Sequence, residues 1–332
     1  CHPADVGGPL MSLLGGLRSS RLVSQLQHID DLESPKAEKV LDRLRGLGGS
    51  AVSHIIEELE VADRNDTEFL VDVLARLATD KNITHFAQGM AGHNERVLSG
   101  IVLALSKGTG YNANKIIELF NIDDVPKAPL CEIAGAQKKR LDVRRVLTQA
   151  YLQESAEKAT LFRIVADVAT KKDTNELISR LTGKDVVAKA HIIDILSRFD
   201  TPEVLQALES RLRDPSKIIR SAAIASIGKL GKTNDVSVLC ELLCDPDLDV
   251  MNKAADIIIK LNHPDTVRHL VIALKDESEY ARRAAVEILN EIGDATSVKD
   301  LLNALGDDDW WVRARATDAL AKIGGPLSLI HI

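Results

Sequence analysis

Apolar residues recur at helical spacing through the second half of the chain, and the same pattern returns every 31 residues. One stripe has the spacing i, i+4, i+8, i+11 and consists of Ile219, Ala223, Ile227 and Leu230. After a short break, a second stripe has the spacing i, i+3, i+7 and consists of Val236, Leu239 and Leu243. Both spacings place the apolar side chains on one face of an α-helix. Each block therefore predicts two helices.

Four aspartates mark the period without any insertion: Asp214, Asp245, Asp276 and Asp307. A fixed period of this size is typical of helical repeat proteins, in which each repeat buries its apolar face against its neighbours. The period can be followed more weakly upstream to Val40. We therefore predict an all-α chain, an α-solenoid of about ten two-helix repeats.

Polar residues and glycines between the stripes predict where the helices begin and end. Short acidic side chains precede the first helix of a block and can accept hydrogen bonds from its free N–H groups. Gly231, Gly324 and Asn262 follow the apolar stripe and suit the left-handed turn that closes a helix.

Residues 1–27 lie outside the period, and we expect an irregular lead-in there, read as upstream sequence. Residues 28–325 are predicted to form the repeats. Residues 326–332 are interpreted as a truncated, artefactual end.

The repeated line L-x-D-P/D-x-x-x-V-R-x-x-A-A-x-x-L-x-x-I-G resembles the short HEAT-type repeat of the phycobilisome-lyase-like class. The resemblance is clearest over residues 181–325 and weaker over residues 40–180. It implies a right-handed solenoid of HEAT-like repeats, with the first-stripe helices on one face and the second-stripe helices on the other.

Enzymes with similar repeats provide alternatives that can be checked against the residues. Deoxyhypusine hydroxylase uses His-Glu pairs as iron ligands, and this sequence contains no His-Glu dipeptide, so that activity is not carried over. Phycobilin lyases share the repeat, but no residue here marks a bilin site. Residues 305–326 also resemble repeats that are attached to bacterial serine/threonine kinases, although the kinase motifs are missing.

Charge, cysteine and histidine content narrow the possible partners, the cellular compartment and the metal sites. The net charge of −7 argues against general binding to nucleic acid or to anionic membranes, and no apolar run has membrane-spanning length. Few cysteines and no signal segment favour a reducing cytoplasm. Cys240 with Cys244, and His263 with His269, lack the further ligands that a metal site needs. We expect no cofactor and no metal.

Two other motifs are interpreted as structural. Residues 108–113 read G-T-G-Y-N-A, which resembles a dinucleotide loop, but they follow a helical stripe and no strand, so we expect an interhelix turn. A basic cluster (Lys138, Lys139, Arg140, Arg144 and Arg145) is read as a solvated helix face.

Aspartate and arginine recur six residues apart in three repeats: Asp214 and Arg220, Asp276 and Arg282, Asp307 and Arg313. Because the pair repeats, we predict a structural ladder that ties the turns of adjacent repeats through bidentate ion pairs. The ladder is interrupted at Met251.

The function that the pattern favours is a non-catalytic scaffold that binds a protein on its concave face. Trp, Tyr and Arg are the residue types enriched at binding hot spots, and four of them gather in two repeats: Trp311, Tyr280, Arg315 and Arg283. We expect Trp311 to contact the partner and Trp310 to pack inward; the alternative is that both tryptophans only fill the groove between repeats. A regulatory arm of a serine/threonine kinase and, more weakly, a phycobilin-lyase-like enzyme stay as alternatives. No residue is predicted to be catalytic.

Overall fold

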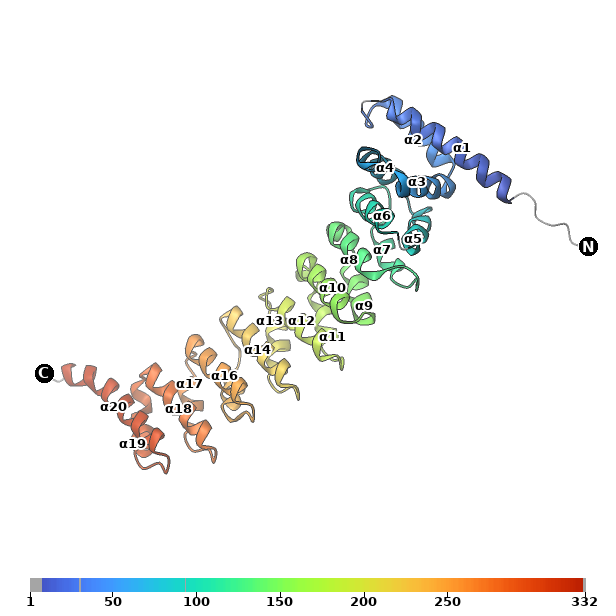
Figure 1. The fold of residues 1–332 in the computed structure, drawn as a ribbon. Coiled ribbons are helices and arrows are strands. Elements are labelled where there is room, and N and C mark those ends of the chain that lie inside the picture. The colour runs from blue at the N-terminus through green and yellow to red at the C-terminus, as the bar shows by residue number, and fades with distance from the viewer. Residues whose placement is uncertain (1–7, 30, 93, 331–332) are drawn as a thin grey trace, which may run out of the picture. The chain divides into compact units, whose positions relative to one another are not determined.

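The computed structural model describes residues 8–29, 31–92 and 94–330, and throughout these ranges the chain is all-α, with no strand (Figure 1). The chain divides into two compact units, residues 1–168 and 169–332. Within each unit, antiparallel helix pairs stack in two layers, so the predicted α-solenoid class is confirmed.

The first unit has a first layer whose successive helices pack against one another: α2 (Pro35–Gly46), α4 (Arg64–Leu77), α6 (Glu95–Lys107), α8 (Lys127–Ala136) and α10 (Ser155–Val168). Its second layer contains α1 (Gly8–Gln27), α3 (Gly49–Val61), α5 (Ile83–Ala91), α7 (Asn114–Leu119) and α9 (Val143–Leu152). A 3₁₀ turn, η1 (Lys138–Arg140), joins α8 to α9.

The second unit repeats the arrangement with the strict 31-residue period. Its first layer contains α12 (Val186–Leu196), α14 (Lys217–Leu230), α16 (Leu248–Leu261), α18 (Glu279–Ile292) and α20 (Trp310–Ile330). Its second layer contains α11 (Thr174–Arg180), α13 (Pro202–Arg211), α15 (Val236–Glu241), α17 (Thr266–Ala273) and α19 (Val298–Ala304). Three short 3₁₀ turns precede or extend second-layer helices: η2 (Lys171–Asp173), η3 (Leu242–Cys244) and η4 (Ala295–Ser297).

The first-stripe residues form the core of the second unit. The equivalent side chains of α14, α16 and α18 are fully buried: Ile219, Val250 and Ala281, Ala223, Ala254 and Ala285, and Ile227, Ile258 and Leu289. The middle stripe residue of each helix is alanine (Ala223, Ala254 and Ala285), which lets neighbouring first-layer helices approach closely. Stacking therefore buries the face that one repeat alone would expose.

The predicted helix ends are confirmed for most repeats of the second unit. Each period aspartate accepts a hydrogen bond from the N–H group two residues later; for Asp214 and Ser216 the distance is 3.0 Å. Gly231 closes α14 at φ 69°, and Asn262 closes α16 at φ 43°, both in the left-handed region. Gly324 does not end its helix, because α20 continues to Ile330.

The expectation of an irregular lead-in over residues 1–27 is wrong for residues 8–27. These residues form α1, which packs on α2 and α3 as the first helix of the second layer. Ser19, Leu22, Val23 and Leu26 are buried, and their spacing of i, i+3, i+4, i+7 is one helical face. The stripe has no repeat in register with it, which is why the period did not reveal this helix. Residues 1–7 lie outside the described part of the chain.

Candidate protein-interaction surface

The ladder residues of the second unit connect each repeat to the next one. Nη1 of Arg220 donates to the carbonyl oxygens of Asp214 and Pro215, at 3.0 and 3.1 Å. Its Nε and Nη2 donate to both carboxylate oxygens of Asp245 in the following repeat, at 2.7 and 2.8 Å. One guanidinium group thus holds its own turn and the next turn together.

Arg282 makes the same set of bonds one period away. It donates to the Asp276 carbonyl oxygen at 2.9 Å and to the Asp307 carboxylate at 2.9 and 3.1 Å. Arg313 donates to the carbonyl oxygens of Asp307 and Asp308. Within the described residues Arg313 has no carboxylate partner.

The two remaining ladder positions of the second unit are occupied by other residue types. Lys189 pairs with Asp214 at 2.8 Å, and both side chains are almost fully buried. Burial alone would raise the pKa of Asp214, but hydrogen bonds from Lys189 and the Ser216 N–H hold that pKa below its ordinary value. Met251 cannot donate, so the Asp276 carboxylate faces the Cys244 thiol, whose Sγ lies 3.3 Å away.

Aromatic and arginine side chains cluster on α18 and α20. Tyr280 is 49% exposed, Trp310 is 62% exposed and Trp311 is half-buried. The Arg283 guanidinium carbon lies 5.7 Å from the Tyr280 ring centroid, and that of Arg315 lies 4.8 Å from the Trp311 ring centroid. These distances suit cation–π contacts.

Carboxylates hold both arginines in place. Arg283 pairs with Asp309 at 2.5 Å, and this hydrogen bond, with burial opposing it, lowers the pKa of Asp309 to about 2. Arg315 pairs with Glu287 at 3.3 Å and with Asp318 at 3.0 Å. The structure therefore brings the four predicted binding residues onto two neighbouring helices, with each arginine fixed over an aromatic ring.

The prediction that Trp310 packs inward is wrong. Val312, Ala316 and Ala319 face the core of the unit and are fully buried. Trp310 lies two residues before Val312, about 200° around the helix, and so points away from that core. The two indole rings meet edge to face, with centroids 5.5 Å apart. Trp311 is the one that is partly covered.

The two motifs that were interpreted as structural contact each other in the first unit. Residues 108–113 form the turn between α6 and α7, as predicted. Arg140, from the basic cluster, donates to the carbonyl oxygens of Gly108, Thr109 and Tyr111 in this turn. Lys138 pairs with Asp167 at 2.7 Å, and Arg145 pairs with Glu118 at 3.0 Å. Much of the cluster therefore stabilises local structure.

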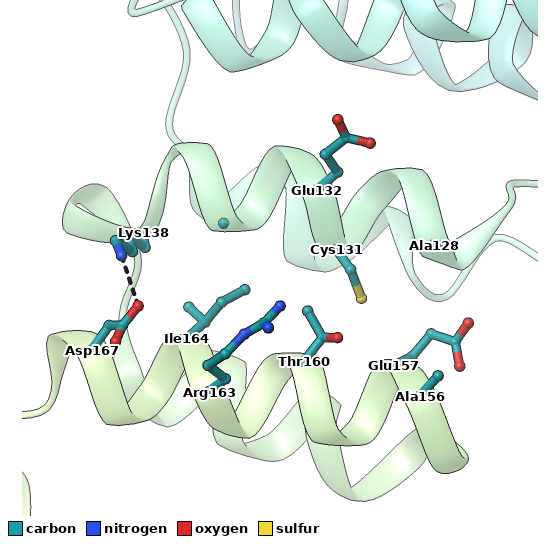
Figure 2. A pocket seen from close by; sticks show the side chains of 11 residues that line it. Ala128, Cys131, Glu132, Lys138, Ala156, Glu157, Thr160, Arg163, Ile164 and Asp167 are labelled. Atoms are coloured by element: carbon teal, nitrogen blue, oxygen red, sulfur yellow. Dashed lines mark hydrogen bonds and ion pairs between the residues drawn. The ribbon is translucent and has the colours of Figure 1, made fainter.

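A groove of about 450 Å³ that the sequence did not predict lies between α8 and α10 (Figure 2). Cys131, Thr160 and Arg163 project into it, and the Lys138–Asp167 pair closes one end (Figure 2). Burial raises the pKa of the Cys131 thiol to about 11, so this thiol stays protonated near neutral pH. The lining residues come from two repeats, which is why no linear motif marks the groove.

Two kinds of site are absent from the described part of the chain. No group of three or more His, Cys, Asp or Glu side chains there could hold a metal ion. No described helix is both long and apolar enough to cross a membrane.

A family model of HEAT repeats matches residues 174–260 and 267–332. The second unit contains HEAT repeats. The matched residues include α18 and α20, on which the aromatic and arginine side chains cluster. No curated protein matches the chain significantly.

Solved structures of several other proteins align with most of the chain. An engineered protein is 17% identical over 92% of this chain and 99% of its own, with a TM-score of 0.37. A chain of the Pds5–Scc1 complex is 14% identical over 96% of this chain, with a TM-score of 0.40. A chain of the Kap95–Nup1 complex is 13% identical over 94% of this chain, with a TM-score of 0.48. The chain spans 61% and 51% of the chains matched in the two complexes.

Proposed function

We propose that this chain is a non-catalytic HEAT-repeat scaffold that binds another protein through the aromatic–arginine surface of α18 and α20. The surface consists of Tyr280, Arg283, Trp311 and Arg315, to which the structure adds Trp310. The observation that carries the proposal is the exposure of large aromatic side chains in two neighbouring repeats, at 49% for Tyr280 and 62% for Trp310. We assign this surface to the concave face as a prediction.

The arginines support the proposal because they are already ordered. Arg283 is tied to Asp309, and Arg315 to Glu287 and Asp318. A partner that packs on the rings therefore meets side chains whose rotamers are largely fixed, which lowers the entropy lost on binding. Aromatic and arginine side chains in such an arrangement are typical of interface hot spots.

The competing interpretation is that the tryptophans only stabilise the repeat. Capture of proteins from the source lysate separates the two, with variants Trp310→Ala and Tyr280→Ala compared to Leu302→Ala, an exposed residue of α19 in the second layer. We expect both aromatic variants to lose the captured partner at an unchanged melting temperature, and Leu302→Ala to keep it. Retention of the same partner by both aromatic variants would refute the proposal.

The kinase-arm alternative rests on the resemblance of residues 305–326 alone. We therefore favour the scaffold.

A further inference from the structure

The groove between α8 and α10 contains three hydrogen-bond donors that lack an acceptor. Cys131 projects into it from α8, and Thr160 and Arg163 project into it from α10, so that the three side chains face one another (Figure 2). Within the described residues, no hydrogen bond or ion pair involves any of these three side chains. Cys131 is only 5% exposed, and buried groups that can donate are normally hydrogen-bonded. The groove therefore offers donors to a ligand that brings the acceptor.

Arg163 carries the free positive charge of this groove. Lys138, at one end, is already paired with Asp167 at 2.7 Å, and the Glu132 carboxylate points away from α10 (Figure 2). Burial and, after it, the Glu157 carboxylate raise the pKa of the Cys131 thiol, whereas the Arg163 guanidinium opposes this increase. Both charges therefore act on the thiol, but no ion pair joins them. One cation is free to bind an anion, and one carboxylate stands nearby.

Small residues leave space beside these donors. The groove has a volume of about 450 Å³, which lies within the range of ligand-binding pockets. Ala128 and Ala156 line it, and a Cβ atom placed on Gly135 would meet no other atom within 4 Å. The open space can therefore accept a side chain from another molecule, with apolar groups available to contact its methylenes.

We propose that the groove between α8 and α10 binds a glutamate side chain of a protein partner. The planar guanidinium group of Arg163 donates two parallel hydrogen bonds to the carboxylate, and the Thr160 hydroxyl donates a third. The methylenes of the glutamate pack on Ala128 and Ala156. A phosphate group fits less well, because its second negative charge meets Glu157 and no second free cation. The choice of a protein ligand rests on the proposed scaffold function, to which this inference adds a contact site in the first unit.

The probe is the peptide acetyl-Gly-Ala-Glu-Ala-Gly-amide, whose only charge is the glutamate carboxylate. Its binding to the full chain is measured by isothermal titration calorimetry, and the matched peptide has glutamine in place of glutamate. The net charge of −7 opposes any general attraction of an anionic peptide, so binding must come from a local site. We expect saturable binding of the glutamate peptide and at least about tenfold weaker binding of the glutamine peptide, which cannot form the charged pair.

Two variants remove the site in different ways, and a third is the control. Arg163→Gln removes the free charge, and Gly135→Leu fills the groove with a side chain for which the helix has room. We expect each to raise the Kd for the glutamate peptide about tenfold at an unchanged or higher melting temperature. The control, Arg64→Gln, removes an exposed arginine that lines a different groove, between α4 and α6, and should bind the peptide like the unmodified chain.

Three results would overturn the inference. The first is equal affinity for the glutamate and glutamine peptides, or no measurable binding of either below about 1 mM. The second is unchanged binding in Arg163→Gln or Gly135→Leu, or the same weakening in Arg64→Gln. The third is displacement of the glutamate peptide by inorganic phosphate but not by sodium chloride at the same ionic strength, which would assign the groove to phosphate groups.

The lysate experiment on the aromatic variants is independent of this test, because Trp310 and Tyr280 lie in the other unit. Loss of the captured partner in those variants, together with unchanged peptide binding in Arg163→Gln, would leave the scaffold function intact and refute the glutamate site. Peptide binding that requires Arg163 and an open groove, together with a partner retained by both aromatic variants, would support the glutamate site and refute the aromatic–arginine surface.

Discussion

Arginine occupies the ladder positions for a chemical reason. In the guanidinium groups of Arg220 and Arg282, Nη1 donates to two carbonyl oxygens of the arginine's own turn. The Nε and Nη2 atoms donate to a carboxylate of the next repeat. Lysine at the same position is a single point charge, and Lys189 makes one such bond. The sequence predicted the residues of the ladder by their offset of six, but the carboxylate that each arginine binds lies 25 residues further on.

Replacement of Arg282 by alanine should lower the free energy of unfolding by about 1–3 kcal/mol, because the Asp307 carboxylate, 11% exposed, loses a bidentate partner. The control is Arg313→Ala, which removes the same carbonyl contacts but no carboxylate pair. Denaturant unfolding followed by circular dichroism compares the two. An equal loss in both variants would show that the ion pair contributes nothing.

The pKa of Asp309 predicts a dependence of stability on pH. Its hydrogen bond to Arg283 lowers the folded-state pKa to about 2, whereas an unfolded aspartate has a pKa of about 3.9. The stabilisation is therefore fully present above the unfolded pKa and is lost as the pH falls through the folded value. In Asp309→Asn, the melting temperature should be lower near neutral pH and should fall less between about pH 4 and pH 2. Parallel melting curves in the two proteins across that range would contradict the prediction.

At the scale of helices, the sequence predicted the helix ends best in the second unit, where the period of 31 residues is strict. The caps at Gly231 and Asn262 followed from residue type, because few other residues adopt a left-handed turn. The missed helix, α1, has a readable stripe but no repeat in register with it. The orientation of Trp310 could have been obtained by counting residues from Val312. The groove between α8 and α10 could not have been predicted from the sequence, because it depends on how two repeats pack.

The gap in the ladder between α16 and α18 can be filled. Met251 is 7% exposed and occupies the position of Arg220 and Arg282, opposite the Asp276 carboxylate. Met251→Arg should raise the free energy of unfolding by about 1–2 kcal/mol, because the new guanidinium group reaches Asp276 and the carbonyl oxygens of its own turn. In an Asp276→Asn background the gain should disappear, while the Asx turn at Ser278 keeps its acceptor. A loss of stability on Met251→Arg would mean that the site is packed too tightly for the longer side chain.

At the scale of the whole chain, a repeat protein is stabilised mainly by contacts between neighbouring repeats. In the second unit, each junction combines a buried apolar stripe with one ladder position, so the junctions resemble one another. One repeat should therefore be removable if the two new neighbours meet in the same register. The period of 31 predicts which segment that is.

Deletion of residues 243–273 removes one full period and joins Leu242 to Leu274. Asp276 then takes the place of Asp245 opposite Arg220, and Met251 is removed, so the ladder continues without interruption from Lys189 to Asp307. We expect the shortened chain to keep its helical circular-dichroism signal per residue and to unfold cooperatively. A deletion of residues 243–258, about half a period, should instead place polar residues against the core and lose much of that signal. If both deletions unfold the chain, or if both are tolerated equally, the register of the repeats is not what holds this unit together.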